Sequence, residues 1–346
     1  MVSKTLVERL HSMIMESSVI TVVAHTHPDG DAVGSTLAMR AFLRMLGKDA
    51  EVILPEAVNA NLRFMVPSGE PVSATDSPDQ ARERLERSDM VICQDCPGFH
   101  RTGILERMLA GIRATKVLID HHIGPDSAHF DIVFSECGIS SASELLFWIL
   151  MEMPEISSDA ARLPEEAATA LMTGMTTDTN NFANSVYPST LEMASKLIAS
   201  GVDRDSIISS INNNYGENRL RAMGWLLKDE MTVTPDGVAY MIITSGDVER
   251  FELREGDTEG FVNLPLQARK IRMSILCKQD GDHYRVSIRS KKGTSANMCS
   301  RKYFNGGGHE QAAGGRLTCP GDLPSMERQH LAAYIEMVTG KFFNEA

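Results

Sequence analysis

The chain has 346 residues, 42% of them hydrophobic, and a formal net charge of −12. This length exceeds what one ordinary hydrophobic core serves, so we expect two domains. The acidic charge argues against a protein that coats long nucleic acid, because non-specific affinity for a long strand comes from Lys and Arg side chains that neutralise phosphates.

The chain shows no sign of export or membrane insertion. Its apolar runs are far shorter than a membrane span, and residues 1–9 mix charges and lack the apolar core of a signal peptide. The six cysteines are scattered and suggest no disulfide framework. We therefore expect a cytoplasmic protein without a membrane partner. Cys93 and Cys96 match C-x-x-C, but a zinc site would need a second Cys pair, so we interpret them as half-buried thiols.

The first strand-like segment leads directly into a polar cluster. Residues 19–24 are β-branched, uncharged and short, which predicts a buried strand. His25, Asp29 and Asp31 follow within seven residues, in a loop shaped by Pro28, which fixes its own φ, and by Gly30, which permits backbone angles closed to other residues. A helix over 32–46 and a strand over 51–54 come next.

Three later apolar segments end in the same way. Residues 90–93 lead into Asp95, residues 116–119 lead into the sequence Asp120-His121-His122, and residues 167–172 lead into Asp178. Helices are predicted over 141–153, 164–176 and 186–200. Strands that alternate with helices predict an α/β fold, here a parallel sheet with helices on both faces.

The second half of the chain has a different pattern. A polar, largely helical connector is expected over 201–222, which separates a first domain (1–200) from a second (223–346). In the second domain, 238–244 reads as a strand, and 271–278 and 283–289 flank Asp280-Gly281 as a hairpin. A last helix is predicted over about 324–340. We expect this domain to be a smaller α/β unit with a mixed sheet.

The polar clusters together predict a metal centre. Imidazole and carboxylate ligands in combination suit a divalent transition metal. Two ions roughly 3.5–4 Å apart need bridging carboxylates and a few further ligands each, and a water shared between them becomes a nucleophile. Six side chains meet this demand: His25, Asp29, Asp31, Asp95, His121 and Asp178. We expect two divalent cations: the imidazoles favour Mn²⁺, Fe²⁺ or Zn²⁺ over Mg²⁺, and Mn²⁺ is the first candidate.

Each of these residues also has an ordinary structural interpretation. A single Asp at a strand end is commonly a helix N-cap or a turn residue, and a single His is commonly packed or exposed. Such explanations would have to hold independently at every cluster, which favours the metal centre. His27 has no counterpart among the ligands, so we expect it to be exposed.

The second domain carries a candidate phosphate site. The glycines of Gly306-Gly307-Gly308 let backbone N–H groups approach a phosphate, and His309 follows them directly. Arg289 ends a predicted strand, and its guanidinium suits bidentate binding of phosphate oxygens. A solvated basic face is the alternative for Lys291 and Lys302.

These motifs, in this order, resemble the DHH phosphoesterase family over essentially the whole chain. The matching segments are His-x-x-x-Asp-Gly-Asp-Ala-Val-Gly-Ser at 25–35, Asp-His-His at 120–122 and Thr177-Asp178-Thr179. The segment from Gly306 to His309, with Ala312-Ala313-Gly314, resembles the DHH-associated C-terminal domain. Within the family the arrangement is similar to the NrnA-type nanoRNases.

The resemblance implies roles for individual residues. One metal would bind His25, Asp29, Asp95 and Asp178, and the other Asp31, Asp95, His121 and Asp178, so that Asp95 and Asp178 bridge. His122 would contact the scissile phosphate, and Asp120 would orient an imidazole. The predicted substrate-binding residues are Arg101, Arg289, Gly307, Gly308 and His309.

The resemblance also implies an activity. We expect a metal-dependent phosphohydrolase that cleaves short RNA oligonucleotides to 5′-mononucleotides and dephosphorylates 3′-phosphoadenosine 5′-phosphate, in a cleft between the domains and without activity on long strands. Alternatives are a phosphodiesterase for cyclic di-AMP or its linear product, a RecJ-like exonuclease, and a nucleotide-binding protein without catalysis. A DHH-type pyrophosphatase is disfavoured by the Gly-Gly-Gly-His segment. A homodimer is compatible with the sequence, which leaves the oligomeric state open.

Overall fold

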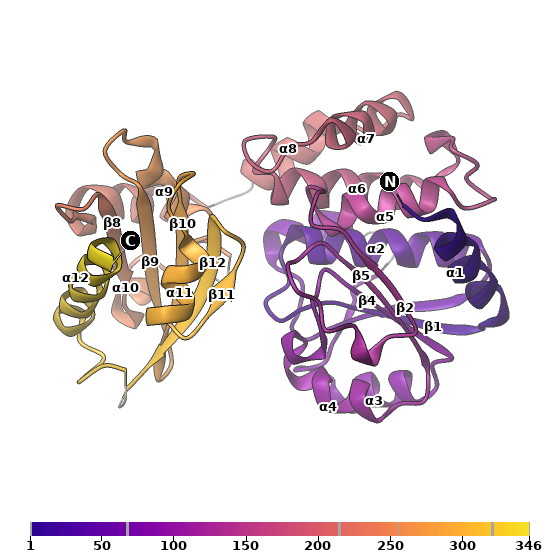
Figure 1. Cartoon of the computed structure of the whole chain (residues 1–346), viewed down its shortest axis with the longest axis horizontal. Helices are drawn as coiled ribbons and strands as arrows, with labels where there is room; N and C mark the ends of the chain where they lie inside the picture. Colours follow the sequence, from indigo (N-terminus) through magenta and orange to yellow (C-terminus); the bar gives the residue numbers. More distant parts are fainter. Residues whose placement is uncertain (1, 67–68, 214–215, 255, 320–321, 346) are drawn as a thin grey trace. The chain divides into compact units, whose positions relative to one another are not determined.

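The chain divides into two compact units, Met1–Asn214 and Tyr215–Ala346, in a computed structural model (Figure 1). The structure describes residues 2–66, 69–213, 216–254, 256–319 and 322–345. The division falls inside the predicted connector 201–222. Helix α8 (Arg204–Asn212) belongs to the first unit and helix α9 (Glu217–Trp225) to the second.

The first unit is built on a parallel sheet in the order β3-β2-β1-β4-β5-β6. Its strands are β1 Val19–Val23, β2 Asp49–Leu54, β3 Val72–Ser73, β4 Met90–Gln94, β5 Thr115–Asp120 and β6 Ile132–Ser135. Strands β1 and β4 are neighbours although β2 and β3 lie between them in sequence. The strand order therefore reverses between β1 and β4, and open α/β sheets bind ligands at the carboxyl ends of strands at such a point.

Helices cover both faces of this sheet, as predicted (Figure 1). They are α1 Lys4–Glu16, α2 Gly30–Met45, α3 Pro78–Glu86, α4 Glu106–Gly111, α5 Ala142–Met151, α6 Glu165–Asp178, α7 Pro188–Ala199 and α8. The larger core packs α1, α2, α5, α6 and α7 on one face, and a smaller core packs α3 and α4 on the other. The helices predicted at 32–46, 141–153, 164–176 and 186–200 correspond to α2, α5, α6 and α7, with ends shifted by up to two residues.

The second unit has a mixed sheet in the order β11-β12-β10-β9-β8-β7. Its elements are β7 Thr232–Val233, β8 Val238–Ile243, β9 Met273–Asp280, β10 His283–Ser290, β11 Gly307–Gly308, β12 Ala312–Thr318, α9, α10 Ser245–Arg250, α11 Ala296–Tyr303 and α12 Arg328–Glu345. In this second sheet, the pairing of β8 with β9 is the only parallel one among the described strands. The predicted hairpin is β9–β10. The last helix begins four residues later and ends five later than the predicted 324–340.

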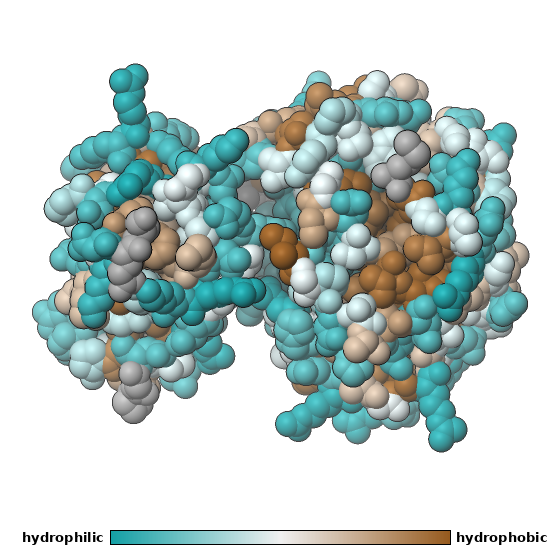
Figure 2. Space-filling model, in the orientation of Figure 1, coloured by the Kyte–Doolittle hydropathy of each residue, from teal (hydrophilic) through white to brown (hydrophobic). Residues whose placement is uncertain are grey.

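Two surface features of the described chain bear on function. Figure 2 shows apolar side chains at the surface over part of the first unit, whereas the visible face of the second unit is mainly hydrophilic. No helix among the described residues is both long and apolar enough to span a membrane.

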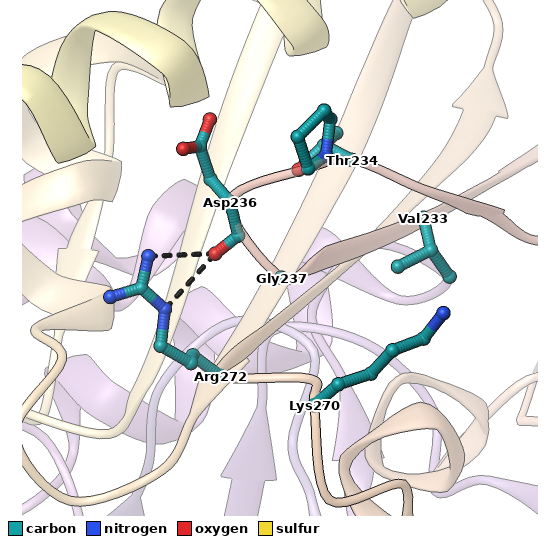
Figure 3. A pocket seen from close by; sticks show the side chains of 7 residues that line it. Val233, Thr234, Asp236, Gly237, Lys270 and Arg272 are labelled. Atoms are coloured by element: carbon teal, nitrogen blue, oxygen red, sulfur yellow. Dashed lines mark hydrogen bonds between the residues drawn. The ribbon is translucent and has the colours of Figure 1, made fainter.

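A shallow pocket of about 590 Å³ lies in the second unit between the β7–β8 turn and the segment before β9 (Figure 3). The guanidinium of Arg272 donates to the carbonyl oxygen of Asp236 there, at 3.0 Å from Nε and 2.7 Å from Nη2. The lining includes Lys270 but none of the predicted substrate-binding residues. The pocket is therefore separate from the Gly-Gly-Gly-His segment.

Candidate metal centre

Three of the predicted ligands follow the strands β1, β4 and β5, and the order of the sheet reverses between the first two of these strands. His25 lies two residues beyond β1, Asp95 follows β4, and His121 follows β5, the next strand along. Asp29 and Asp31 stand at the start of α2, and Asp178 ends α6 rather than a strand. The fold thus brings the carboxyl ends of neighbouring strands and two helix ends to one place.

Asp29 combines a structural role with the geometry of a ligand. It is the N-cap of α2, and its Oδ1 accepts hydrogen bonds from the backbone N–H groups of Asp31 at 3.0 Å and Ala32 at 3.1 Å. The N-cap interpretation of a single Asp is therefore correct here. The cap engages one oxygen, so it does not exclude metal binding by the other.

His25 faces both Asp29 and Asp95. Its Nε2 lies 3.4 Å from Oδ2 of Asp95 and 4.0 Å from Oδ1 of Asp29. Its Nδ1 lies 2.8 Å from the carbonyl oxygen of Thr26, and an N–H at Nδ1 leaves Nε2 for a metal. Burial alone would lower the pKa of His25, but the hydrogen bond and charge of Asp95 raise it to about 10.

A second group of side chains shares Asp95. Nε2 of His121 lies 3.5 Å from Oδ1 of Asp95, 4.0 Å from Oδ2 of Asp31 and 3.5 Å from Oδ2 of Asp178. The ligand atoms of His25, Asp29 and Asp95 lie within 4.8 Å of one another, and so do those of Asp31, Asp95 and His121. Two potential cation sites with a common carboxylate result. Asp178 is placed beside the second group, and the contacts do not show it in the first.

Asp95 is held in a conformation that its neighbours impose. Its φ of 50° lies in the left-handed region, which costs free energy for a residue with a side chain, and its N–H donates to the carbonyl oxygen of Ile119 at 3.0 Å. Its Oδ1 is buried and has no hydrogen-bond partner. Burial would raise the pKa of this carboxyl, but the neighbouring imidazoles of His121 and His25 lower it well below its usual range. A buried, ionised oxygen without a hydrogen bond is what a metal ligand requires, so the residues fit a cation.

The carboxylates of Asp31 and Asp178 lie close to Asp95 in the same poorly solvated site. Burial and the charge of Asp95 raise the pKa of Asp31 to about 7, against the opposing effect of His121. Burial, with Asp31, Asp29 and Asp95 nearby, likewise raises the pKa of Asp178 well above its usual value. These carboxyls resist ionisation together because like charges in a poorly solvated site repel. Divalent cations would remove that penalty.

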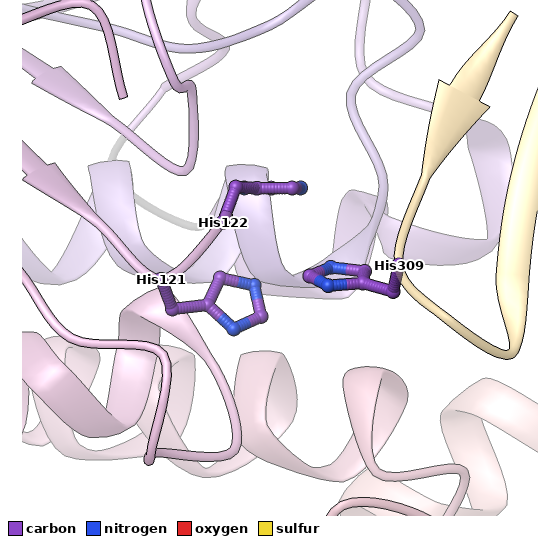
Figure 4. Close-up of side chains that lie close together, drawn as sticks. All are labelled: His121, His122 and His309. Carbon is purple, nitrogen blue, oxygen red and sulfur yellow. The ribbon is translucent and has the colours of Figure 1, made fainter. Parts of the chain in front are cut away.

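Asp120 and His122 pair at the end of β5, and Nδ1 of His122 also lies 3.7 Å from Oδ1 of Asp95. Nδ1 of His122 lies 2.8 Å from Oδ1 of the fully buried Asp120, whose Oδ2 accepts the backbone N–H of His122 at 3.2 Å. Figure 4 shows His121 and His122 side by side after β5, and His309 in the loop that precedes β12. The carboxylate fixes Nδ1 as the donor, so Nε2 is the ring atom left for another partner.

Glycine lets α2 and α6 approach closely behind the ligands. A Cβ on Gly174 would lie 2.0 Å from the Ser143 hydroxyl oxygen and 2.9 Å from Oδ1 of Asp31. A Cβ on Gly30 would lie 2.4 Å from the Thr177 hydroxyl oxygen. Gly30 begins α2 and has no positive φ, so the close approach of Thr177, and not the backbone freedom of glycine, is what requires Gly30 here. The sequence signal for this close approach is the spacing of Gly30 and Gly34, which lie on the same face of α2. A Cβ on Gly34 would lie 2.6 Å from the carbonyl oxygen of Ala170 in α6.

The other predictions for the first unit have mixed outcomes. Arg101 has an exposed side chain, and its carbonyl oxygen accepts the N–H of Thr26 at 2.8 Å, next to His25. His27 is exposed, as predicted. Cys93 and Cys96 are completely buried rather than half-buried, because they belong to the core under α3 and α4.

In the second unit, the Gly-Gly-Gly-His segment forms a tight edge strand. Gly307 pairs with Gly314 and Gly308 with Ala313. Gly308 has a φ of +145°, and a Cβ there would lie 2.6 Å from the carbonyl oxygen of Ala312. A side chain at Gly308 would thus break the strand. Next to Gly307 lies the side chain of Asn297, which the sequence analysis did not single out.

Comparison with known families agrees with the fold. A model of the DHH family, N-terminal domain, matches residues 19–175, and a model of the DHHA1 domain matches residues 237–336. The chain belongs to the DHH family of phosphoesterases and carries a DHHA1 domain in its second unit. The predicted resemblance is confirmed.

Individual relatives extend this comparison. An exopolyphosphatase-related protein from Bacteroides fragilis has a crystal structure that matches with a TM-score of 0.90 at 30% identity, covering 98% of this chain and 97% of that one. The bifunctional oligoribonuclease and PAP phosphatase NrnA of Thermus thermophilus is 27% identical over 86% of this chain and 84% of its own length. The cyclic-di-AMP phosphodiesterase GdpP of Geobacillus thermodenitrificans is 24% identical over 94% of this chain, which spans 49% of that protein.

Proposed function

We propose that this chain is a two-metal phosphohydrolase that releases 5′-mononucleotides from short oligoribonucleotides and dephosphorylates 3′-phosphoadenosine 5′-phosphate. The observation that carries the proposal is that two groups of potential ligands share Asp95. The Oδ1 atom of Asp95 is buried and has no hydrogen-bond partner. The similarity to NrnA over most of both chains supports the substrate class. The similarity to GdpP makes a cyclic di-AMP phosphodiesterase the second candidate.

The proposed ligand sets follow the two groups. His25, Asp29 and Asp95 would hold one cation, Asp31, Asp95 and His121 the other, and Asp178 would join both sets. Imidazole and carboxylate together favour Mn²⁺. When bound, the two cations supply an acidified water and positive charge for the phosphoryl oxygens.

His122 and Asp120 would act on the substrate rather than on the cations. Asp120 orients the imidazole through the 2.8 Å contact with Nδ1. Held in this way, His122 would present its Nε2 to a non-bridging oxygen of the scissile phosphate. Asp120 is thus a positioning residue for His122, as carboxylate partners of histidine commonly are.

The second unit would bind a substrate phosphate through Arg289, His309 and the backbone N–H groups of Gly307 and Gly308. Arg289→Ala is expected to raise KM for a dinucleotide by about ten- to a hundredfold, because a hydrogen bond to a charged group is worth about 1.5–3 kcal/mol. The activated ester bis-p-nitrophenyl phosphate, which offers no second phosphate, should lose much less. Steady-state kinetics on both substrates measure the difference.

Arg285→Ala is the matched control, because Arg285 lies on the same face of β10 and is equally half-buried. It should leave both substrates nearly unaffected. Equal losses for the two substrates in Arg289→Ala would contradict a phosphate-binding role.

Substrate length provides the test of the whole proposal. With Mn²⁺, the full-length chain should turn over a dinucleotide and 3′-phosphoadenosine 5′-phosphate. The rate per RNA end should fall as RNA lengthens from two to about five residues, since the net charge of −12 offers no general attraction for a longer strand. The assay compares dinucleotide, pentanucleotide, a long oligomer, 3′-phosphoadenosine 5′-phosphate and cyclic di-AMP at equal concentration.

Each alternative has its own signature in this assay. Preferred cleavage of cyclic di-AMP would replace the proposal with the second candidate. An undiminished rate on long single strands would indicate a RecJ-like exonuclease. Tight nucleotide binding without turnover under any divalent cation would indicate a binding protein.

A further inference from the structure

Glu144 is a buried carboxylate that the proposed mechanism does not use. It lies in the first turn of α5 and is 0% exposed. Its Oε2 accepts hydrogen bonds from the Ser140 N–H at 3.0 Å, from the Ser140 hydroxyl, and from the Thr190 hydroxyl at 2.7 Å. Its Oε1 lies 3.4 Å from Nε1 of Trp148. A buried charge needs such donors, so Glu144 and its partners fix one another.

These donors come from three parts of the first unit. Ser140 lies in the loop before α5, Trp148 lies one turn further along α5, and Thr190 lies in the first turn of α7. The Thr190 hydroxyl also accepts the N–H of Tyr187 at 3.0 Å. The Ser141 hydroxyl accepts the N–H of Glu144 itself at 3.0 Å and caps α5. The segment from 140 to 144 is therefore held in a single conformation against α7.

The same segment holds Asp31. The N–H of Ala142 donates to Oδ2 of Asp31 at 2.7 Å, and the N–H of Ser143 donates to Oδ1 at 2.9 Å. Each oxygen of this carboxylate accepts one hydrogen bond, so the first turn of α5 sets its orientation. A change in that turn would rotate Asp31 relative to His121, whose Nε2 is 4.0 Å away.

We propose that Glu144 is a positioning residue of the metal centre. Its hydrogen bonds fix the conformation of the first turn of α5, and the backbone N–H groups of that turn orient the Asp31 carboxylate. In this orientation Asp31 would bind a cation together with Asp95 and His121. The inference rests on the proposed function for the presence of that cation. Glu144 acts through the amides of Ala142 and Ser143, and its effect should reach one of the two cation sites more than the other.

The test compares Glu144→Ala and Glu144→Gln in the full-length chain, with Glu152→Ala as the control. Glu152 is an exposed glutamate at the other end of α5. The first readout is hydrogen exchange at the Ala142 and Ser143 amides in the metal-free protein. The second is Mn²⁺ titration followed by electron paramagnetic resonance, which separates the affinities of two sites.

Glu144→Ala should lose protection at both amides and weaken one Mn²⁺ site by about 10–100-fold, as outer partners of metal ligands do. Glu144→Gln retains an oxygen for Ser140 and Thr190, so affinity should stay within about fivefold of the wild type, with only charge assistance lost. Glu152→Ala should match the wild type. A merely structural glutamate would lower the melting temperature without this site-selective loss or its rescue by glutamine.

Wild-type amide protection and wild-type affinity at both sites in Glu144→Ala would overturn the inference. If Glu144→Ala does not fold, Thr190→Val removes one donor to Oε2 and should weaken the same site about three- to tenfold, as expected for one lost hydrogen bond. No change in Thr190→Val would then overturn the inference. If the wild type binds no Mn²⁺, the proposed function fails, whereas amide exchange in the metal-free variants still decides the role of Glu144.

Discussion

Asp95→Ala is expected to reduce turnover by on the order of 10³-fold or more. Loss of the shared carboxylate would remove the cations that stabilise the phosphoryl oxygens, and the loss of even one hydrogen-bond donor to a developing oxyanion costs about 10²–10³-fold in enzymes. Asp95 belongs to both ligand groups, so its loss should disrupt both cation sites together. The fold should remain intact, because the Asp95 carboxylate lies against the imidazoles of His25 and His121, at 3.4 and 3.5 Å, which belong to the site rather than to the hydrophobic core. Turnover, bound Mn²⁺ and far-UV circular dichroism are measured on the same preparation.

Asp79→Ala is the control for this variant. Asp79 is an exposed aspartate in the first turn of α3 in the same unit, and its replacement should leave turnover and metal content unchanged. Asp178→Ala should resemble Asp95→Ala if Asp178 bridges as proposed. Full activity in Asp95→Ala would exclude a two-metal centre built on this residue.

Asp31→Ala is expected to abolish turnover and also to destabilise the protein. Its carboxylate accepts the buried N–H groups of Ala142 and Ser143, and an unpaired buried donor costs about 1–3 kcal/mol. We expect the free energy of unfolding of the metal-free protein to fall by about 2–6 kcal/mol for the two donors, less whatever is regained by removing a carboxylate that repels Asp95. Urea denaturation in the presence of a chelator measures this change, and turnover is assayed separately.

Asp203→Ala separates the two effects of Asp31→Ala. Asp203 caps α8, and its side chain accepts the N–H of Ser206 at 3.0 Å. Loss of this cap should cost about 0.5–2 kcal/mol while activity stays at the wild-type level. An Asp31→Ala variant as stable as Asp95→Ala would show that the α5 amides do not depend on Asp31.

Local sequence patterns predicted much of the first unit. The β-branched run at 19–24 and the apolar runs at 90–93 and 116–119 became β1, β4 and β5, because short apolar segments are buried as strands wherever they pair. The polar residues after them were predicted to form one metal centre, because a structural explanation would have to hold independently at every cluster. The start of α12 was predicted less well, since a helix end depends on its cap and on what the helix packs against.

The sequence by itself determined which residue types were available for the metal centre and, through the order of its motifs, the family. Tertiary structure decided which atoms meet. The strand order places β1 beside β4, so that the Asp95 carboxylate contacts the imidazoles of both His25 and His121. Close packing at Gly174 and the amides of Ala142 and Ser143, more than a hundred residues from Asp31, set the direction of its carboxylate. Local patterns cannot reveal such contacts, because they arise only after distant segments have packed against one another.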